Sequence, residues 1–273
     1  MEEGICHNTN IMLEQRIFNI EAYNAAQEHA LQNQFRQMEE RFGILCDVDE
    51  TLVDTIGNHS DRINRGARIM GFSEELPTRE ELIEKGGTGA FAELFGMTSD
   101  EWEIMMQRIR DSKYINAGAT LYHPEIVSLV EQFSNTKMLG FVTARPGTEK
   151  TLRVTEEDLF RRIGLPQLPI VLRPSTVAIA ETSAWKLGIL KQIAVQDTQK
   201  RLILVDDSLA TANVILEYNS CNESNPIIQV VYKGPLTIPS LESGAFKTDP
   251  KMGIYEADWH EMPQVIQQIQ QQW

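Results

Sequence analysis

The sequence predicts an α/β fold in which a doubly wound parallel sheet is interrupted by an all-helical segment. Two observations lead to this prediction. Short apolar runs alternate with helical patterns through most of the chain, as expected when crossover helices join parallel strands. The segment from 55 to 117 departs from this alternation, because it holds several helical patterns and no convincing strand.

The first expected element is a helix from about Ile17 to Met38, a stretch without Gly or Pro that has one moderately apolar face. This face packs either on the core or against a second subunit, which would make the protein a homodimer through this helix. We divide the chain into an N-terminal helical extension (1–40), an α/β core (41–54 and 118–273) and a helical cap (55–117).

Buried strands are predicted where short apolar runs are bounded by turn formers or charged residues. These runs are "FGILCDV" (42–48), "TKMLGFVTA" (136–144), "PIVLR" (169–173), "KRLILVDDS" (200–208) and "PIIQVVYKG" (226–234). Helical patterns lie between and after them, in "HPEIVSLVEQF" (123–133), "TEKTLRVTEEDLFRRIG" (148–164), "TSAWKLGILKQIAVQ" (182–196) and "EMPQVIQQIQQQW" (261–273). Strands that alternate with helices in this way predict a parallel sheet with helices on both faces.

The composition excludes several classes of protein. The formal net charge of −14 disfavours general binding to nucleic acid or to anionic membranes. The sequence has no apolar run of the length that a spanning helix needs and no signal-peptide pattern at its start. Three widely spaced cysteines, Cys6, Cys46 and Cys221, fit reduced thiols better than disulfides. We therefore expect a cytoplasmic protein without membrane partners.

Polar residues follow several of the predicted strands at the point where each apolar run ends. Ligands bind at the carboxyl ends of the strands in open parallel sheets, so these residues are the candidates for a site. They are Asp47, Asp49 and Thr51 after the first strand, Thr143 and Arg145 after the second, and Asp206, Asp207 and Ser208 after the fourth, with Lys186 near a helix start.

The aspartates of this set predict a metal site. Asp47 and Asp49 are two residues apart and can share one pocket with Asp206 and Asp207. Converging carboxylates are costly unless a hard cation neutralises them. Mg²⁺ takes oxygen ligands and commonly lies between carboxylates and a phosphate, whereas zinc would need His or Cys ligands nearby. Mg²⁺ is therefore the expected cofactor.

With a cation and a phosphoryl group in place, one carboxylate can attack phosphorus while a second acts as general acid and then as base. Thr143 and Lys186 would supply a hydrogen bond and a positive charge to the phosphoryl oxygens. Lys191 is the alternative to Lys186, and the position of Lys186 near the helix start favours Lys186.

Four motifs, "DVDET", "VTARP", the lone Lys186 and "LVDDS", each at a strand end or a helix start, resemble in their order those of the haloacid dehalogenase superfamily of aspartate-nucleophile phosphatases. The resemblance covers about residues 43 to 215 in architecture. It implies a Rossmann-like core with a cap inserted after the first motif. It also disfavours the dehalogenase branch, whose members lack the second acid that Asp49 supplies.

The resemblance assigns roles to these residues. Asp47 would be the nucleophile and a Mg²⁺ ligand, and Asp49 the general acid/base that also binds the metal through its backbone carbonyl. Thr51 would orient Asp49. The phosphoryl group would be held by a set of four residues: Thr143, Ala144, Arg145 and Lys186. The remaining metal ligands would be Asp207 first and its neighbour Asp206.

The function expected from this resemblance is a Mg²⁺-dependent phosphomonoesterase that forms an aspartyl phosphate on a small organic phosphate. Two other enzymes stay open, a phosphomutase and a polynucleotide 3′-phosphatase, the latter because "AWKLGILKQI" followed by "LVDDS" resembles that branch. Outside the enzymes, a phosphate-binding protein or a phosphoacceptor module would use similar residues. The net charge and the size of the cap weigh against the polynucleotide substrate.

Overall fold

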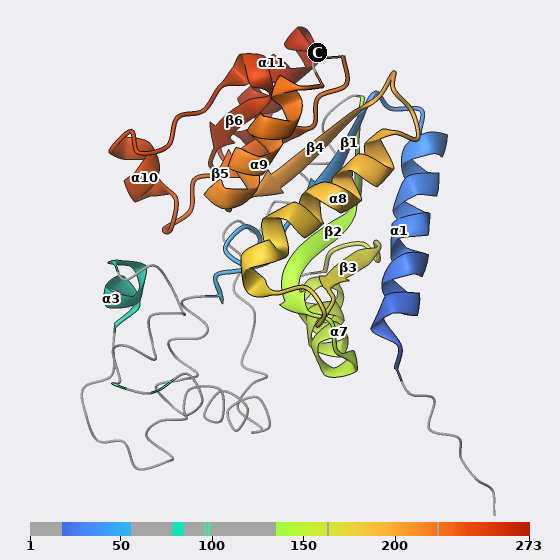
Figure 1. Ribbon diagram of the computed structural model, residues 1–273, viewed down its shortest axis with the longest axis vertical. Coiled ribbons are helices and arrows are strands. Elements are labelled where there is room, and N and C mark those ends of the chain that lie inside the picture. Colours follow the sequence, from blue (N-terminus) through green and yellow to red (C-terminus); the bar gives the residue numbers. More distant parts are fainter. Residues whose placement is uncertain are drawn as a thin grey trace, which may run out of the picture.

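The computed structural model describes residues 18–55, 78–84, 96, 98, 135–162, 164–222 and 224–273 (Figure 1). Most of the predicted cap (55–117), the predicted helix at 123–133 and residues 1–17 lie outside this part of the chain. Within the cap the structure describes one short helix, α3 (Arg79–Glu84). No helix of the described ranges is long and apolar enough to cross a membrane.

Six parallel strands form one sheet in the order β3-β2-β1-β4-β5-β6. Their bounds are β1 (Phe42–Cys46), β2 (Thr136–Pro146), β3 (Ile170–Arg173), β4 (Arg201–Asp206), β5 (Ile228–Tyr232) and β6 (Ile254–Ala257). From β1 the chain runs outward to β3 on one side and then, from β4, to β6 on the other, so the predicted doubly wound sheet is confirmed. The last strand, β6, was not predicted, because only four residues of mixed polarity form it.

Helices cover both faces of the sheet, as Figure 1 shows. One face carries α1 (Ile20–Gln37), α8 (Thr182–Ala194) and α9 (Leu209–Ser220), and the other carries α7 (Glu149–Glu156) and α11 (Met262–Gln272). A π-helical segment, η3 (Glu157–Arg162), continues α7. Shorter elements are η4 (Ile179–Glu181), α10 (Ile238–Glu242) and η5 (Pro250–Met252). The predicted helices at 148–164, 182–196 and 261–273 are thus present, whereas α9 and α10 were not predicted.

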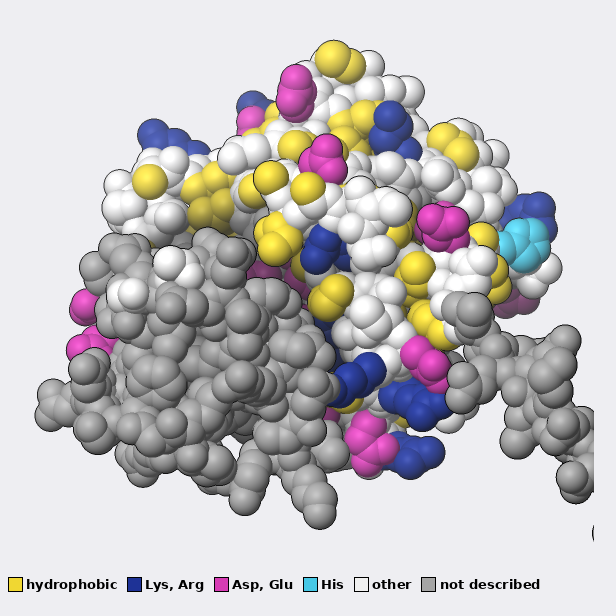
Figure 2. All heavy atoms as spheres, turned by 60° about the horizontal axis from the view of Figure 1, so that its bottom comes forward, with side chains coloured by type: hydrophobic (Ala, Val, Ile, Leu, Met, Phe, Trp, Pro, Cys, Tyr) yellow, Lys and Arg dark blue, Asp and Glu magenta, His cyan; other side chains and the backbone are white. Residues whose placement is uncertain are grey.

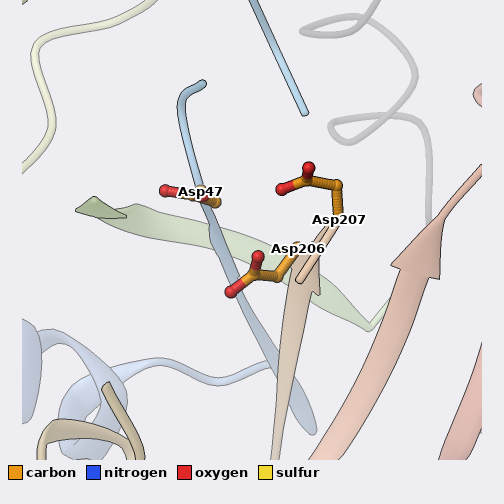
Figure 3. Close-up of side chains that lie close together, drawn as sticks. All are labelled: Asp47, Asp206 and Asp207. Atoms are coloured by element: carbon orange, nitrogen blue, oxygen red, sulfur yellow. The ribbon is translucent and has the colours of Figure 1, made fainter. Parts of the chain in front are cut away.

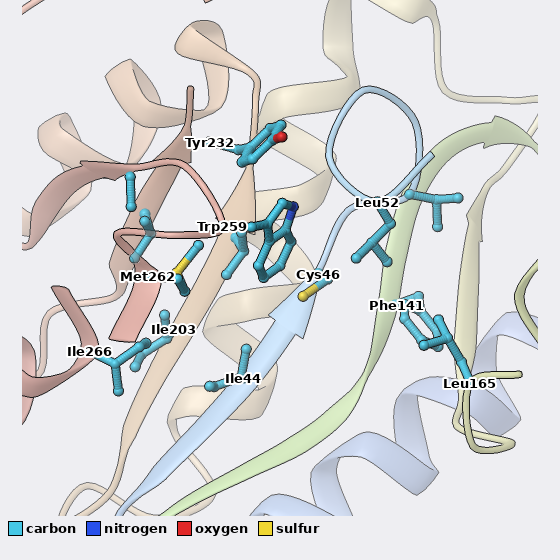
Figure 4. Packing of buried hydrophobic residues seen from close by; sticks show 14 of the residues in the cluster. Ile44, Cys46, Leu52, Phe141, Leu165, Ile203, Tyr232, Trp259, Met262 and Ile266 are labelled. Carbon is cyan, nitrogen blue, oxygen red and sulfur yellow. The ribbon is translucent and has the colours of Figure 1, made fainter. Parts of the chain in front are cut away.

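Apolar side chains from both sides of the sheet fill two buried clusters. In the cluster that α11 covers, the Trp259 ring lies near Ile44, Cys46 and Tyr232 (Figure 4). Trp259 is 2% exposed, and its ring centroid lies 5.7 Å from that of Tyr232. Burial of this large aromatic ring fixes the loop after β6 against the centre of the sheet.

The N-terminal helix α1 packs on the core of its own chain. Leu31 and Phe35 are fully buried there. The helix approaches the sheet closely at Gly140, where an added Cβ would lie 2.9 Å from Leu31 Cδ2 and 2.4 Å from the carbonyl oxygen of Pro169. Of the two expectations for this helix, packing on the core is therefore the one observed, and a homodimer through it stays a prediction.

Asn24 of α1 occupies the open edge of the sheet. Its side-chain amide donates to the carbonyl oxygen of Leu172 at 2.6 Å, and its side-chain oxygen accepts from the N–H of Leu172 at 3.1 Å. This pair replaces the hydrogen bonds that a further strand would make with β3, an edge strand. The side chain is 3% exposed, so both bonds are shielded from water.

We expect Asn24→Ala to lower the free energy of unfolding by about 1–3 kcal/mol, because it leaves two buried backbone groups of β3 without partners. Chemical denaturation measures this difference. Asn33→Ala in the same helix is the matched control, since the Asn33 side chain accepts only an exposed hydrogen bond from Arg36. Equal stability of the two variants would contradict this account of the sheet edge.

Candidate active site

Lys186 lies between two aspartates at the carboxyl end of the sheet. Its Nζ is 3.0 Å from Asp47 Oδ2 and 2.7 Å from Asp206 Oδ2. β1 and β4 are neighbours with Cys46 opposite Val205, which brings the residues that follow them side by side. The N–H of Asp47 donates to the carbonyl oxygen of Val205 at 2.9 Å. The sheet register and the first turns of α8 therefore assemble this contact, and Lys186 rather than Lys191 takes part in it.

The three charges of this cluster are almost completely buried, with 2% exposure for Lys186, 5% for Asp47 and none for Asp206. Burial raises the pKa of Asp47, the positive charge of Lys186 opposes this shift, and the resulting pKa is about 7. Burial alone would lower the pKa of Lys186, but Asp206 and then Asp47 more than offset this, so the pKa is raised. Each charge depends on the others to remain ionised in the core.

Asp206 and Asp207 differ in their surroundings although they are adjacent in the chain (Figure 3). Both oxygens of Asp206 have partners: Lys186 at Oδ2 and the N–H of Ser208 at Oδ1, 2.9 Å away. Asp207 is held through its backbone, whose N–H donates to Thr51 Oγ1 at 3.1 Å. The Asp207 carboxylate lies near those of Asp47 and Asp206, but the ion pairs of Lys186 are with Asp47 and Asp206.

Thr51 connects three parts of the site. Its hydroxyl accepts from Asp207, and its carbonyl oxygen accepts from the indole N–H of Trp259 at 3.0 Å. Sequence reasoning gave Thr51 the task of orienting Asp49. The observed hydrogen bond joins its hydroxyl to Asp207, and orientation of Asp49 by Thr51 stays a prediction. Trp259 was missed, because no motif marks it and only the folded sheet brings it to this loop.

Asp47, Asp206 and Asp207 can converge on one cation. Each offers a carboxylate oxygen, and these oxygens lie within 4.8 Å of one another. Asp47 Oδ1 is buried and has no hydrogen-bond partner among the described residues. Burial, followed by the charges of Asp206 and Asp47, raises the pKa of Asp207 well above its usual value. An oxygen-liganded cation would relieve both the unpaired oxygen and the repulsion, so the site fits a hard metal ion such as Mg²⁺.

Asp49 lies apart from this cluster and pairs with Arg145. The guanidinium Nε lies 3.1 and 2.9 Å from the two carboxylate oxygens, and Nη2 lies 2.7 Å from Oδ1. Thr55 adds a hydrogen bond from its hydroxyl to Asp49 Oδ1 at 2.6 Å. Sequence reasoning placed Arg145 among the phosphate-binding residues. The structure shows a carboxylate as the partner of its side chain, and phosphate binding by Arg145 stays a prediction.

The remaining predicted phosphate-binding residues lie at the end of β2. Thr143 is fully buried, and its hydroxyl accepts from the N–H of Arg145 at 3.3 Å. Ala144 is exposed, and its carbonyl oxygen accepts from Arg173 Nε at 3.1 Å. Phosphate binding by these two residues stays a prediction.

Figure 2 turns forward the side of the molecule toward which β2 and β4 point in Figure 1. Over the described part of this face, basic and acidic side chains are interspersed rather than gathered by sign. The positive charges of the site are the inward-facing Lys186 and Arg145, whose side chains are 2% and 14% exposed. Among the described residues, the positive charges of the site are thus largely buried and do not form a basic surface.

Neither a protein-family model nor a curated protein matches the sequence. Solved structures do resemble it. The Protein Tyrosine Kinase A of Mycobacterium tuberculosis has a TM-score of 0.56 and 11% identity, covering 84% of this chain and 99% of that one. A haloacid dehalogenase-like family hydrolase from Streptococcus pneumoniae gives 0.52 and 17%, covering 82% and 97%. A "predicted phosphatase" from Clostridium acetobutylicum gives 0.51 and 14%, covering 84% and 100%. The chain thus has the haloacid dehalogenase-like fold.

We expect Lys186→Met to lower the free energy of unfolding by about 3–5 kcal/mol when a chelator is present, because Asp47 and Asp206 then lose their shared buried cation. Chemical denaturation in EDTA measures this loss. Lys191→Met is the matched control in the same helix, since Lys191 is exposed and only lies over the Tyr218 ring. A similar, small effect of both substitutions would show that the buried cluster does not need Lys186.

Proposed function

We propose that the protein is a Mg²⁺-dependent phosphatase that cleaves small organic phosphate monoesters through an aspartyl phosphate. The observation that carries the proposal is the buried Oδ1 of Asp47 beside Lys186 and Asp207, an oxygen that has no hydrogen-bond partner in the described part of the chain. Such a carboxylate oxygen can act as a nucleophile toward phosphorus once a cation has bound beside it. The haloacid dehalogenase-like fold and the four sequence motifs support the same chemistry.

Mg²⁺ would be held by carboxylate oxygens of Asp47 and Asp207 and by the backbone carbonyl of Asp49. When bound, it would offset the negative charge of the aspartates and of the substrate phosphate. Asp206 is less suited as a direct ligand, because both of its oxygens already accept hydrogen bonds. Its role is to fix Lys186 beside Asp47.

In the first step, a carboxylate oxygen of Asp47 forms a bond to phosphorus while the bond between phosphorus and the ester oxygen breaks. Asp49, which would carry a proton at this stage, donates it to the departing oxygen, which leaves as an alcohol, and Arg145 would stabilise the Asp49 carboxylate that remains. In the second step, Asp49 accepts a proton from water as that water attacks the phosphoryl group on Asp47. Inorganic phosphate leaves, and Asp47 and Asp49 return to their starting states.

The residues around the phosphoryl group have separate tasks in these steps. Lys186 offsets negative charge next to Asp47 from within hydrogen-bond distance. Thr143 and the backbone after it would donate to the phosphoryl oxygens. The substrate would be a small, soluble phosphate monoester in the cytoplasm.

We expect the protein to release p-nitrophenol from p-nitrophenyl phosphate only when Mg²⁺ is present. Asp47→Asn removes the nucleophile and should reduce turnover on the order of 10³-fold or more. Asp249→Asn is the matched control, since Asp249 is exposed and Asn caps the η5 turn equally well. Absence of turnover by the wild type, or unchanged turnover by Asp47→Asn, would refute the proposed phosphatase.

We expect Mg²⁺ to raise the melting temperature of the wild type, because it binds the folded site and not the unfolded chain. At a Mg²⁺ concentration 100 times the dissociation constant, the free energy of unfolding rises by about 2.7 kcal/mol. Asp207→Asn should lose this gain, since it removes a ligand. Asp206→Asn should instead lower the melting temperature in EDTA, because Lys186 loses a partner. Thermal denaturation with and without Mg²⁺ separates these effects. An undiminished Mg²⁺ response of Asp207→Asn would remove Asp207 from the ligand set.

A further inference from the structure

The guanidinium of Arg145 is held from two sides. On one side, Nε and Nη2 contact Asp49. On the other, Nη1 donates to Thr155 Oγ1 at 3.0 Å and lies 3.6 Å from Asp158 Oδ2. Each of the three guanidinium nitrogens therefore donates a hydrogen bond to an acceptor of the protein itself. These hydrogen bonds on both sides fix the orientation of the guanidinium group.

The second side of this contact is built from buried residues of α7 and η3. Thr155 is fully buried and donates its own hydroxyl hydrogen to the carbonyl oxygen of Thr151 at 2.8 Å. That bond leaves a lone pair of the Thr155 oxygen for Arg145. Asp158, 4% exposed, lies in the π-helical segment, and such segments are frequent at functional sites.

The charges agree with this arrangement. Arg145 lies between two carboxylates, and its side chain is 14% exposed. A guanidinium that already faces two carboxylates is poorly suited to hold a substrate phosphate as its main partner.

We infer that Arg145, anchored by Thr155 and Asp158, is a positioning residue that sets the direction of the Asp49 carboxylate during phosphoryl transfer. The inference rests on the proposed phosphatase function and assigns Arg145 a task other than binding the phosphate. Bidentate contact fixes a carboxylate in one plane, and the hydroxyl of Thr55 adds a further hydrogen bond to it. Proton transfer to the leaving group depends on that direction.

Two aryl phosphates test this inference through their leaving groups. Phenolate is a basic leaving group and needs the proton from Asp49, whereas p-nitrophenolate leaves with much less help. In single-turnover assays with Mg²⁺, Arg145→Met should slow phenol release about 10- to 100-fold and slow p-nitrophenol release less, with KM unchanged. Arg145→Lys should recover part of the lost rate. Thr155→Val should show the same substrate dependence with a smaller loss.

Two comparisons make the test specific. In the Asp49→Asn background, Arg145→Met should cause no further loss, because the two residues act as one unit. Thr151→Val is the matched control for Thr155→Val, since it lies one turn earlier in α7 and its hydroxyl contacts Thr148. Melting temperatures in EDTA and with Mg²⁺ identify any variant that is merely unfolded or has lost metal binding.

Different results contradict different claims. If Arg145→Met raises KM and weakens inhibition by inorganic phosphate, equally with and without Asp49→Asn, then Arg145 binds phosphate and the inference is wrong. Equal losses with both aryl phosphates that add to those of Asp49→Asn would also overturn it. Both results leave the phosphatase itself intact. If the wild type cleaves neither substrate, the proposed function fails and the inference fails with it.

Discussion

The site depends on one buried cation, Lys186, that two aspartates share. Three carboxylates, Asp47, Asp206 and Asp207, come together at the ends of neighbouring strands, and one ammonium group cannot neutralise all three. Burial makes the excess charge costly, because each ion has given up its hydration. The cluster therefore carries an excess of negative charge that a further cation would offset. We expect this excess charge to lower the stability of the fold without a cation and to favour the binding of one.

The acids of the first strand end are divided between two positive partners. Asp47 is buried against Lys186, whereas the Asp49 side chain is 28% exposed and pairs with Arg145. Two residues of the same type thus acquire different surroundings, since Asp47 faces a buried ammonium group and Asp49 faces a guanidinium group. The division originates in the sheet, since Lys186 comes from the crossover between β3 and β4 and Arg145 from the end of β2. Both residues lie at the carboxyl edge of the sheet.

Local patterns were sufficient for the features that are local. The apolar runs identified β1 to β5, and the helix start distinguished Lys186 from Lys191. The sequence did not reveal β6, the partner of Arg145 or the roles of Trp259 and Asp158, because these depend on contacts between distant segments. Trp259, for example, reaches Thr51 across 208 positions of the chain. The domain boundaries at 40, 54 and 117 stay predictions.

The loop after β1 has a fixed backbone conformation. Glu50 has a positive φ of 57°, a conformation that costs a residue with a side chain about 1–3 kcal/mol. Leu52 and Val53, at 0% and 3% exposure, offset this cost by burying their side chains directly after it. Their N–H groups both donate to the carbonyl oxygen of Val48, which closes the loop on itself. The Asp49 backbone is thus fixed before any ligand binds, so the binding energy of a substrate need not be spent on ordering it.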